Sequence, residues 1–360
     1  MAAPIFVVGT GRSGTTLLRM MLSAHPRVYL THEASFHLMD SMFPAGRSGE
    51  EFLGYFFRSA SFRWLRLDPR EVMAGLERPL TRARLCEVFE AVMRVKAAQH
   101  GKERFGDKTP SHTAHLARIY ACWPGARVVR IVRDPRMVVR SLRSMPWGPG
   151  SVIGAAAMCE IERRQVAPFV DRTLKVRLED LLEAPRDVMA RVLDFVGEPW
   201  SDQVLDHPRF GPGVDDMPPL PWFARAARAP AGPIRQDWAS WDPVELRLVE
   251  RLTRDCMTED GYAPAPASAL ASQPSGLRVF GRWVSELPRA MAELGTAAGA
   301  LRRSRRDAAQ SGAEMMALFR KLNPRACEAY AGFAMPDPPA LPEGWETALA
   351  PAVPRLASTQ

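Results

Sequence analysis

The feature that most constrains this chain is a glycine-rich loop, Gly9–Thr16 (GTGRSGTT), near its first residue. The apolar run Pro4–Gly9 is too short for a helix and contains β-branched residues, which predicts a buried strand. Thr15–Ala24 has helical character, and His25-Pro26 ends that helix. A strand, a glycine-rich turn and a helix in this order indicate an α/β domain with a parallel sheet.

The chemistry of the glycine-rich loop favours a bound anion. Backbone N–H groups of such a turn and the positive end of the helix dipole together form an anion cradle. The spacing from Gly9 to Gly14 matches a nucleoside-triphosphate loop, but Thr15 stands where that loop carries its lysine. The loop cation is instead Arg12, and no magnesium site is evident. The loop therefore predicts a phosphate-like ligand without a metal, with a nucleotide kinase or triphosphatase as the alternative.

Apolar patterns further along the chain predict more strands and helices of the same fold. Strands are predicted at Arg27–Leu30, Arg127–Val132 and Leu174–Leu178, and a helix follows each of the last two. We expect a three-layer α/β fold, a parallel sheet flanked by helices, with the glycine-rich loop at the carboxyl end of the first strand. Composition divides the chain into a main domain at 1–265, a linker at 266–276, and a helical, arginine- and proline-rich C-terminal extension at 277–360.

The charge balance points to an anionic ligand or partner, since the net charge is +8 and the isoelectric point about 9.6. Nucleic acid is not expected, because basic and aromatic residues are not interleaved as they are in single-strand binders. No run approaches the roughly 20 apolar residues of a transmembrane segment. The first residues lack the pattern of a signal peptide, so we expect a cytoplasmic protein.

The residues that could bind metal or form disulfides are few and scattered. His112 and His115 lack a third ligand nearby, so a structural role is expected and no metal is predicted. The absence of paired cysteine spacing predicts reduced thiols at Cys86, Cys122, Cys159, Cys256 and Cys327.

Two segments carry a family resemblance. Residues 6–26 resemble the 5′-phosphosulfate loop of sulfotransferases that use 3′-phosphoadenosine-5′-phosphosulfate (PAPS), in the branch of tyrosylprotein and many bacterial enzymes. Residues 129–142 are similar to the family's 3′-phosphate motif, an arginine at a strand end and a serine in the next helix; here these are Arg133 and Ser141. Further similar segments extend the resemblance over about 4–265, at 105–110, 174–185, 193–205, 238–241 and 261–264.

The resemblance implies an enzyme that moves the sulfuryl group of PAPS to an acceptor hydroxyl by in-line displacement, with 1–265 as its catalytic domain. It assigns the 5′-phosphosulfate to Arg12, Ser13, Gly14, Thr15 and Thr16. The fork of donors on Arg133 suits a phosphate, and nearly two helical turns separate Pro135 from Ser141, so both groups can face one pocket. A binding module that kept the loop and lost catalysis is a further alternative.

Sulfuryl transfer needs a base, cations on the transferring group and a donor to the leaving oxygen. The resemblance places the base at Glu33, after the second predicted strand. His32 is the rival base, because an imidazole also suits proton abstraction near neutral pH. Lys108 is the candidate donor to the leaving oxygen, with Asp107 or Pro110 holding its loop. Arg12 acts with them as the catalytic cation of the loop.

The acceptor is less constrained than the donor. Residues 36–100 and 207–235 are expected to wall the acceptor site, for the hydroxyl of a phenol, secondary metabolite, lipid, carbohydrate or protein tyrosine. The aromatic candidates, of which half or more are expected to be core, are Phe36, Phe43, Tyr55, Phe56, Phe57, Trp64, Trp222 and Phe223.

The tail at 277–330 has helical patterns and a basic turn containing Arg302, Arg303, Arg305 and Arg306. Two uses stay open. Its apolar stripe packs on the catalytic domain or on a second subunit, which would make a homo-oligomer, or its basic turn contacts an anionic membrane or an acidic acceptor.

Overall fold

The structure of the chain is a computed structural model. It describes residues 3–44, 46–145, 147–212, 217, 222–223, 226, 237–269, 272–304, 336–337 and 339–341. The strands in these ranges are Ile5–Val8 (β1), Val28–His32 (β2), Arg104–Lys108 (β3), Arg127–Val132 (β4) and Thr173–Arg177 (β5). The α-helices are Thr15–Ala24 (α1), Phe36–Met42 (α2), Gly49–Arg58 (α3), Ala60–Leu65 (α4), Pro69–Met73 (α5), Leu85–Gln99 (α6), Leu116–Cys122 (α7), Pro135–Arg143 (α8), Val152–Val166 (α9), Leu178–Glu183 (α10), Pro185–Val196 (α11), His207–Phe210 (α12), Pro243–Leu252 (α13), Arg254–Asp260 (α14) and Gly276–Ser304 (α15).

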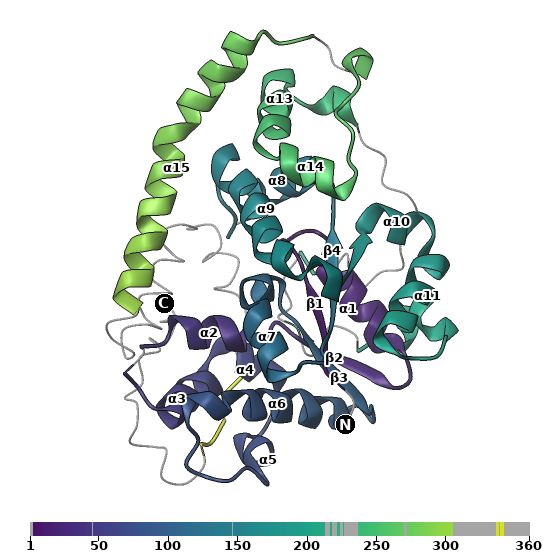
Figure 1. Cartoon of the computed structure of the whole chain (residues 1–360), viewed down its shortest axis with the longest axis vertical. Helices are drawn as coiled ribbons and strands as arrows, with labels where there is room; N and C mark the ends of the chain where they lie inside the picture. The colour runs from purple at the N-terminus through teal and green to yellow at the C-terminus, as the bar shows by residue number, and fades with distance from the viewer. Residues whose placement is uncertain are drawn as a thin grey trace, which may run out of the picture.

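The strands form one parallel sheet in the order β2-β3-β1-β4-β5. This confirms the predicted parallel sheet, with the glycine-rich loop at the carboxyl end of β1 (Figure 1). Since β1 lies between β3 and β4, the carboxyl ends of those two strands flank the loop. In an open parallel sheet, such a change of direction in strand order is where ligands bind.

The interior strand β3, which lies beside β1, was not among the strands predicted from apolar patterns. Its sequence, RFGDK, carries three charged residues among its five and lacks an apolar run. Even so, Asp107 and Lys108 are fully buried. Gly106 is needed here because a Cβ at this position would lie 1.9 Å from the backbone oxygen of Ile5 on β1.

Helices cover both faces of the sheet, which confirms the three-layer prediction (Figure 1). Successive side chains of a strand point to opposite faces. On β1, Ile5 and Val7 pack with α1, α10 and α11, whereas Phe6 and Val8 pack with α6 and α7. Because both faces of β1 are buried, every residue of the strand is apolar, which accounts for the apolar run in the sequence.

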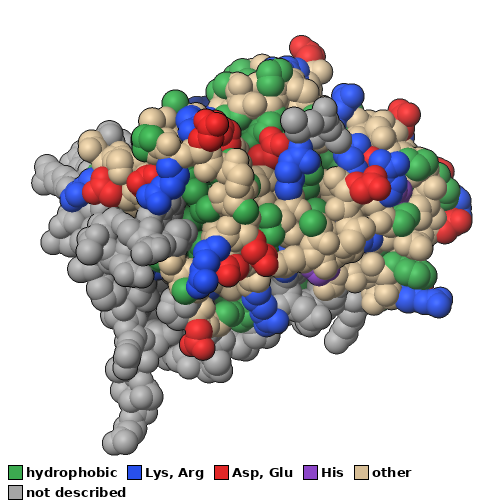
Figure 2. All heavy atoms as spheres, turned by 90° about the horizontal axis from the view of Figure 1, so that it is seen from below, with side chains coloured by type: hydrophobic (Ala, Val, Ile, Leu, Met, Phe, Trp, Pro, Cys, Tyr) green, Lys and Arg blue, Asp and Glu red, His purple; other side chains and the backbone are tan. Residues whose placement is uncertain are grey.

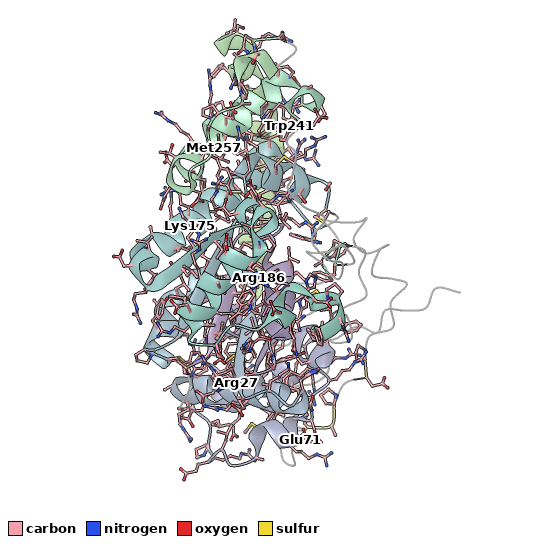
Figure 3. The ribbon with its side chains drawn as sticks, turned by 90° about the vertical axis from the view of Figure 1, so that its right-hand side faces the viewer. Arg27, Glu71, Lys175, Arg186, Trp241 and Met257 are labelled. Atoms are coloured by element: carbon pink, nitrogen blue, oxygen red, sulfur yellow. A yellow bond between two sulfur atoms is a disulfide. The ribbon has the colours of Figure 1, made fainter. Side chains whose placement is uncertain are left out.

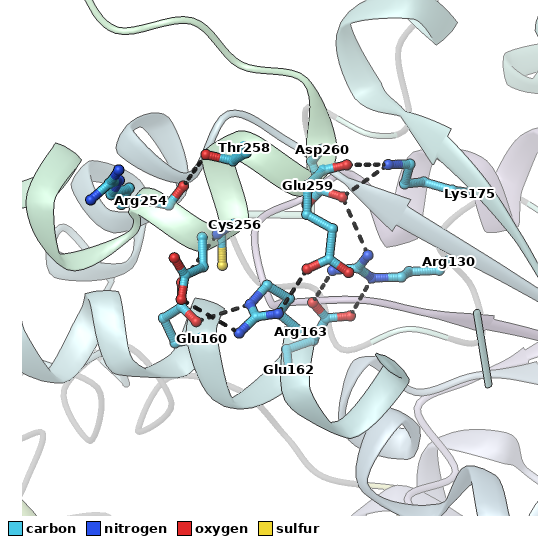
Figure 4. Close-up of polar contacts among 11 residues, drawn as sticks. Arg130, Glu160, Glu162, Arg163, Lys175, Arg254, Cys256, Thr258, Glu259 and Asp260 are labelled. Atoms are coloured by element: carbon cyan, nitrogen blue, oxygen red, sulfur yellow. Dashed lines mark hydrogen bonds and ion pairs between the residues drawn. The ribbon is translucent and has the colours of Figure 1, made fainter. Parts of the chain in front are cut away.

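A third cluster joins α8, α9, α13 and α15 beyond the end of the sheet. In Figure 3, Trp241 and Met257 mark this end of the molecule, and Glu71 marks the opposite end. Figure 4 shows how the cluster is tied to the sheet through buried ions. Arg130 on β4 donates to Glu162 on α9 at 2.8 and 2.7 Å and to Asp260 on α14 at 3.3 Å.

Helix α15 is fastened to the N-terminus of α9 by two carboxylates. Glu293 accepts from the backbone N–H groups of Gly150 at 2.9 Å and Ser151 at 3.1 Å. Glu286 accepts from the N–H of Val152 at 2.8 Å. These groups surround the unsatisfied first turn of α9, where negative charge also complements the helix dipole. Helix α15 packs on α9 and α13, but Met291 and Leu294 of the apolar stripe that was predicted to be buried are 69% and 62% exposed. The division into domains stays a prediction, and 305–330 lies outside the described residues.

The surface mixes charges of both signs. On the face shown in Figure 2, basic and acidic side chains lie next to one another. Ion pairs near the surface of the molecule include Arg78 with Glu50 at 2.9 Å and Arg84 with Glu87 at 2.7 Å. None of the helices in the described part of the chain combines the length and the apolar character needed to cross a membrane.

The prediction of five reduced thiols was wrong for two of them. Cys86 on α6 and Cys122 at the end of α7 form a disulfide, with Cα atoms 6.0 Å apart. Two helices distant in sequence bring the thiols together, so the sequence spacing gave no signal. Cys159 and Cys256 are free and buried, and Cys327 lies outside the described residues. The cytoplasmic location stays a prediction.

Reduction of the Cys86–Cys122 bond should lower the free energy of unfolding by roughly 2–4 kcal/mol, because the bond restricts the unfolded chain. Denaturant unfolding with and without dithiothreitol measures this change. The control is the double variant Cys86→Ser/Cys122→Ser, which should have the lower stability already and should not respond to the reductant. If the variant and the native chain respond equally, the bond is not the source of the difference.

Candidate active site

The glycine-rich loop has the backbone of an anion cradle. Gly9 and Gly14 have φ values of 145° and 102°, and a Cβ on Gly9 would lie 2.3 Å from the carbonyl oxygen of Ile131 on β4. Gly14 precedes α1 and offers no side-chain cap, so the first N–H groups of that helix remain available to a ligand. The buried Ser13 hydroxyl has no hydrogen-bond partner among the described residues. These features fit the 5′-phosphosulfate assignment.

The residues predicted to bind the 5′-phosphosulfate and those predicted to bind the 3′-phosphate lie next to one another. Arg12 Nε donates to Ser141 Oγ on α8 at 3.1 Å. Arg133, just beyond β4, donates from Nη1 to the backbone oxygen of Arg12 at 3.2 Å. Arg12 itself has a left-handed backbone, with φ 72°. Thus the loop, the end of β4 and α8 meet at one arginine.

Glu179 supports this corner, although no sequence pattern singles it out. Its carboxylate accepts from the backbone N–H of Asp134 at 3.0 Å and from the Tyr262 hydroxyl at 2.7 Å. It therefore joins the turn that carries Arg133 to the Gly261 turn after α14. A small cavity adjoins this turn, lined by both Ser13 and Arg133 and extending to Arg130, Glu162, Asp260, Cys159 and Cys256.

The similar segment at 238–241 packs against α8 through cation–π contacts. The Arg136 guanidinium lies 4.2 Å from the Trp238 ring centre, and that of Arg140 lies 5.2 Å from Trp241. Asp237 precedes Trp238, at a position where the resemblance to tyrosylprotein enzymes implies a lysine. Arg235, the nearest alternative cation in sequence, lies outside the described residues.

Glu33 and Lys108 form an ion pair beside the loop. Lys108 Nζ donates to Glu33 Oε1 at 2.5 Å and to Thr16 Oγ1 at 3.3 Å. The backbone N–H of Glu33 donates to the carbonyl oxygen of Lys108 at 2.7 Å, which fixes the turn after β2 to the end of β3. Glu33 holds a left-handed conformation, φ 48°, and Ser35 holds another, φ 53°. The lysine is fully buried, and burial lowers its pKa against the opposing effect of Glu33.

Asp107, one of the two residues expected to hold the loop of Lys108, also shapes the turn that carries Glu33. Its buried carboxylate accepts from the hydroxyls of Thr31 and Thr109, each at 2.6 Å, and from the N–H of Ala34 at 3.2 Å. Burial raises the pKa of Asp107, and the two hydroxyl donors oppose that rise. One carboxylate thus holds the residues on either side of Glu33 against β3.

His32 lies next to Glu33 but is enclosed. Its Nε2 is 3.9 Å from Glu33 Oε1, and its side chain is 3% exposed against 38% for Glu33. Burial, followed by the charges of Lys108 and Arg19, lowers its pKa well below 6.5. Neither ring nitrogen has a hydrogen-bond partner among the described residues. His32 is therefore neutral and a weak proton acceptor at physiological pH.

Phe223 is the aromatic candidate that lies at the Glu33–Lys108 pair. Its ring meets His32 edge-on, with centres 4.8 Å apart, and Lys108 Nζ lies 5.8 Å from its centre. Most of the other candidates belong to the core, as expected: Phe36, Phe43, Phe56, Phe57 and Trp64 are buried, whereas Tyr55 and Trp222 are half-buried.

His112 and His115 form a cluster with His37 of α2, in which His37 and His112 are buried and His115 is half-buried. Their ring centres are 5.5 to 6.5 Å apart. Burial lowers the pKa of His112 to about 3, so the ring is neutral. Among the described residues, no group of three or more histidine, cysteine, aspartate or glutamate side chains could hold a metal.

Known proteins share parts of the sequence of this chain. The model of the sulfotransferase family matches residues 4–202. The protein-tyrosine sulfotransferase of Drosophila melanogaster is 27% identical over 223 residues, which cover 57% of this chain and 40% of that protein. Protein-tyrosine sulfotransferase 1 of Danio rerio is 29% identical over 218 residues, covering 56% and 55%. The chain spans about half the length of the curated relatives it matches. A solved sulfotransferase domain from the curacin biosynthetic pathway is similar over 74% of this chain and 99% of that one, with a TM-score of 0.47 and 17% identity.

The family match extends over more than half of the chain, from β1 through α11. It includes the glycine-rich loop, the Glu33–Lys108 pair, and both Arg133 and Ser141. The chain belongs to the sulfotransferase family.

Proposed function

We propose that this chain transfers the sulfuryl group of PAPS to an acceptor hydroxyl, without a metal. One observation carries the proposal. Lys108 Nζ lies within hydrogen-bond distance of both the Glu33 carboxylate, at 2.5 Å, and Thr16 of the glycine-rich loop, at 3.3 Å. A proton acceptor, a proton donor and an anion cradle therefore meet at one point, as sulfuryl transfer requires.

In the proposed reaction, Glu33 accepts the proton of the acceptor hydroxyl while the acceptor oxygen forms a bond to sulfur. The bond from sulfur to the bridging phosphate oxygen breaks, and Lys108 donates a hydrogen bond to that leaving oxygen. Arg12 and the loop N–H groups stabilise charge on the sulfuryl oxygens. The products are the sulfated acceptor and 3′-phosphoadenosine-5′-phosphate (PAP).

The donor would span the loop and α8. Arg12, Ser13, Gly14, Thr15 and Thr16 would hold the 5′-phosphosulfate. Arg133 and Ser141 would hold the 3′-phosphate, and their contacts with Arg12 support this proposal because they put both groups at one end of the loop.

Glu33 is a better base than His32 in this geometry. The Glu33 carboxylate is partly exposed, so an acceptor can reach it, whereas His32 is buried with a strongly lowered pKa. For the acceptor itself we propose a phenolic hydroxyl, including that of protein tyrosine. Phe223 at the pair gives an aromatic wall, and the relatives named above are protein-tyrosine sulfotransferases.

Glu33→Gln should lower transfer by about 10²–10⁴-fold, because the amide cannot accept the proton. PAP and sulfated product are measured by mass spectrometry after incubation with PAPS and a panel of phenols and tyrosine peptides. PAP affinity in calorimetry without magnesium should be unchanged. The matched control is Glu183→Gln, at an exposed carboxylate on α10. Magnesium-dependent ATP binding in place of PAP binding would indicate a kinase or triphosphatase, and PAP binding without transfer by the native chain would indicate a binding module.

Transfer should fall at alkaline pH as Lys108 loses its proton. Burial lowers the pKa of this lysine from 10.5, so its charge is lost at a lower pH than that of an exposed lysine. Lys108→Arg keeps the positive charge to above about pH 12, so the alkaline fall in kcat should move upward or disappear even if the rate is lower. An unchanged alkaline limb in the variant would show that another group titrates.

Arg133→Ala should weaken PAP binding by about 10–150-fold, the loss of a charge-assisted hydrogen bond of roughly 1.5–3 kcal/mol. Binding of adenosine 5′-phosphosulfate, which lacks the 3′-phosphate, should change much less. Calorimetry with both ligands makes the comparison. Arg140→Ala is the control, since it removes an exposed arginine from the same helix as Ser141. Equal losses for both ligands would refute the 3′-phosphate assignment.

A further inference from the structure

Glu179 on α10 holds the backbone next to Arg133, the residue proposed to bind the 3′-phosphate. The peptide unit that follows the Cα of Arg133 contains the N–H of Asp134, which donates to Glu179 Oε1 at 3.0 Å. Because a peptide unit is planar, holding this N–H fixes the backbone of Arg133 on its carboxyl side. A carboxylate repels a phosphate, so a favourable effect of Glu179 on the donor has to pass through Arg133.

Tyr262 holds the other oxygen of the Glu179 carboxylate. Its hydroxyl donates to Glu179 Oε2 at 2.7 Å, and Tyr262 is buried. Burial, followed by the charge of Glu179, raises the pKa of Tyr262, so the phenol keeps the proton that it donates. The Arg177 guanidinium lies 4.4 Å from the centre of the Tyr262 ring and supports it from one side. With a donor on each oxygen, the orientation of the carboxylate is fixed.

The turn at the end of α14 places Tyr262. Gly261 ends that helix with φ 77°, a left-handed conformation that suits glycine. Asp260, on the other side of the glycine, accepts from Arg130 on β4 and from Lys175 on β5, each at 3.3 Å. The turn is therefore fastened to the same strand, β4, whose end carries Arg133.

We propose that Glu179 is a positioning residue for the 3′-phosphate and that Tyr262 holds it in place. The pair sets the direction of Arg133, and thereby the preference of the donor site for a nucleotide that carries a 3′-phosphate. The match to the family model ends at residue 202, so Tyr262 brings a part of the chain beyond that match into the donor site. This inference rests on the proposed function, in which Arg133 binds the 3′-phosphate.

Calorimetry with PAP and with adenosine 5′-monophosphate, which lacks only the 3′-phosphate, measures this preference as a ratio of two affinities. Glu179→Ala should lower PAP affinity by roughly tenfold and change monophosphate affinity by less than about twofold, since the loss acts through Arg133. Glu179→Gln should keep the native ratio. Its amide oxygen can accept from Asp134 while its amide nitrogen donates to the Tyr262 oxygen.

Tyr262→Phe removes a single oxygen atom, so it decides the question even if Glu179→Ala does not fold. It should lower the ratio of affinities by roughly threefold, and it should add no further loss to Glu179→Ala, because Tyr262 acts through Glu179.

The matched control is Glu160→Ala. Glu160 also accepts from a backbone N–H, that of Cys256 at 3.1 Å, and so ties α9 to α14 away from Arg133. This variant should lose thermal stability without a change in the ratio. The inference is overturned if Glu179→Ala or Tyr262→Phe keeps the native ratio, if the control lowers it equally, or if Glu179→Gln is no better than alanine. A native chain that binds both nucleotides equally would overturn the proposed 3′-phosphate site as well.

Discussion

The position of β1 in the middle of the sheet is the constraint on which the rest of the structure depends. With β3 on one side and β4 on the other, a single loop at the end of β1 is within reach of both neighbouring strand ends. Lys108 comes from the end of β3, and Arg133 follows β4. The loop meets the first through Thr16 and the second through Arg12. A different strand order would separate these groups even if every local element formed correctly.

Local sequence patterns predicted much of this arrangement, because the strand, the turn and the helix form through interactions between residues close in sequence. The apolar run of β1, the glycine-rich turn and the helix after it are adjacent in sequence, and their order implied the sheet. The helix after Asp134-Pro135 was equally clear, since Asp134 caps its first turn. The location of the site then follows from a general rule, since ligands of open parallel sheets bind at the carboxyl ends of the strands.

The rest depends on contacts between distant residues. The interior strand β3 was missed because it lacks an apolar run, and its buried Asp107 and Lys108 are satisfied by partners on β2 and in the turns after β2 and β3. The family resemblance, and not periodicity, singled out Glu33 and Lys108. Glu179 bridges two turns separated by more than a hundred residues, and no pattern marks it. The cysteine pair is of the same kind, since only the packing of α6 and α7 brings those thiols together.

Residues with a left-handed backbone at the site limit which substitutions the chain can accept. Among the described non-glycine residues with positive φ, Arg12, Glu33 and Ser35 lie at the site, and Arg66 is the fourth. Each such conformation costs about 1–2 kcal/mol, which glycine would not incur. Selection for stability alone would therefore favour glycine at positions 12 and 33, where it would remove the loop cation and the carboxylate. The site keeps strained backbone conformations because it needs the side chains at these positions. Stability and activity therefore oppose each other at Arg12 and Glu33.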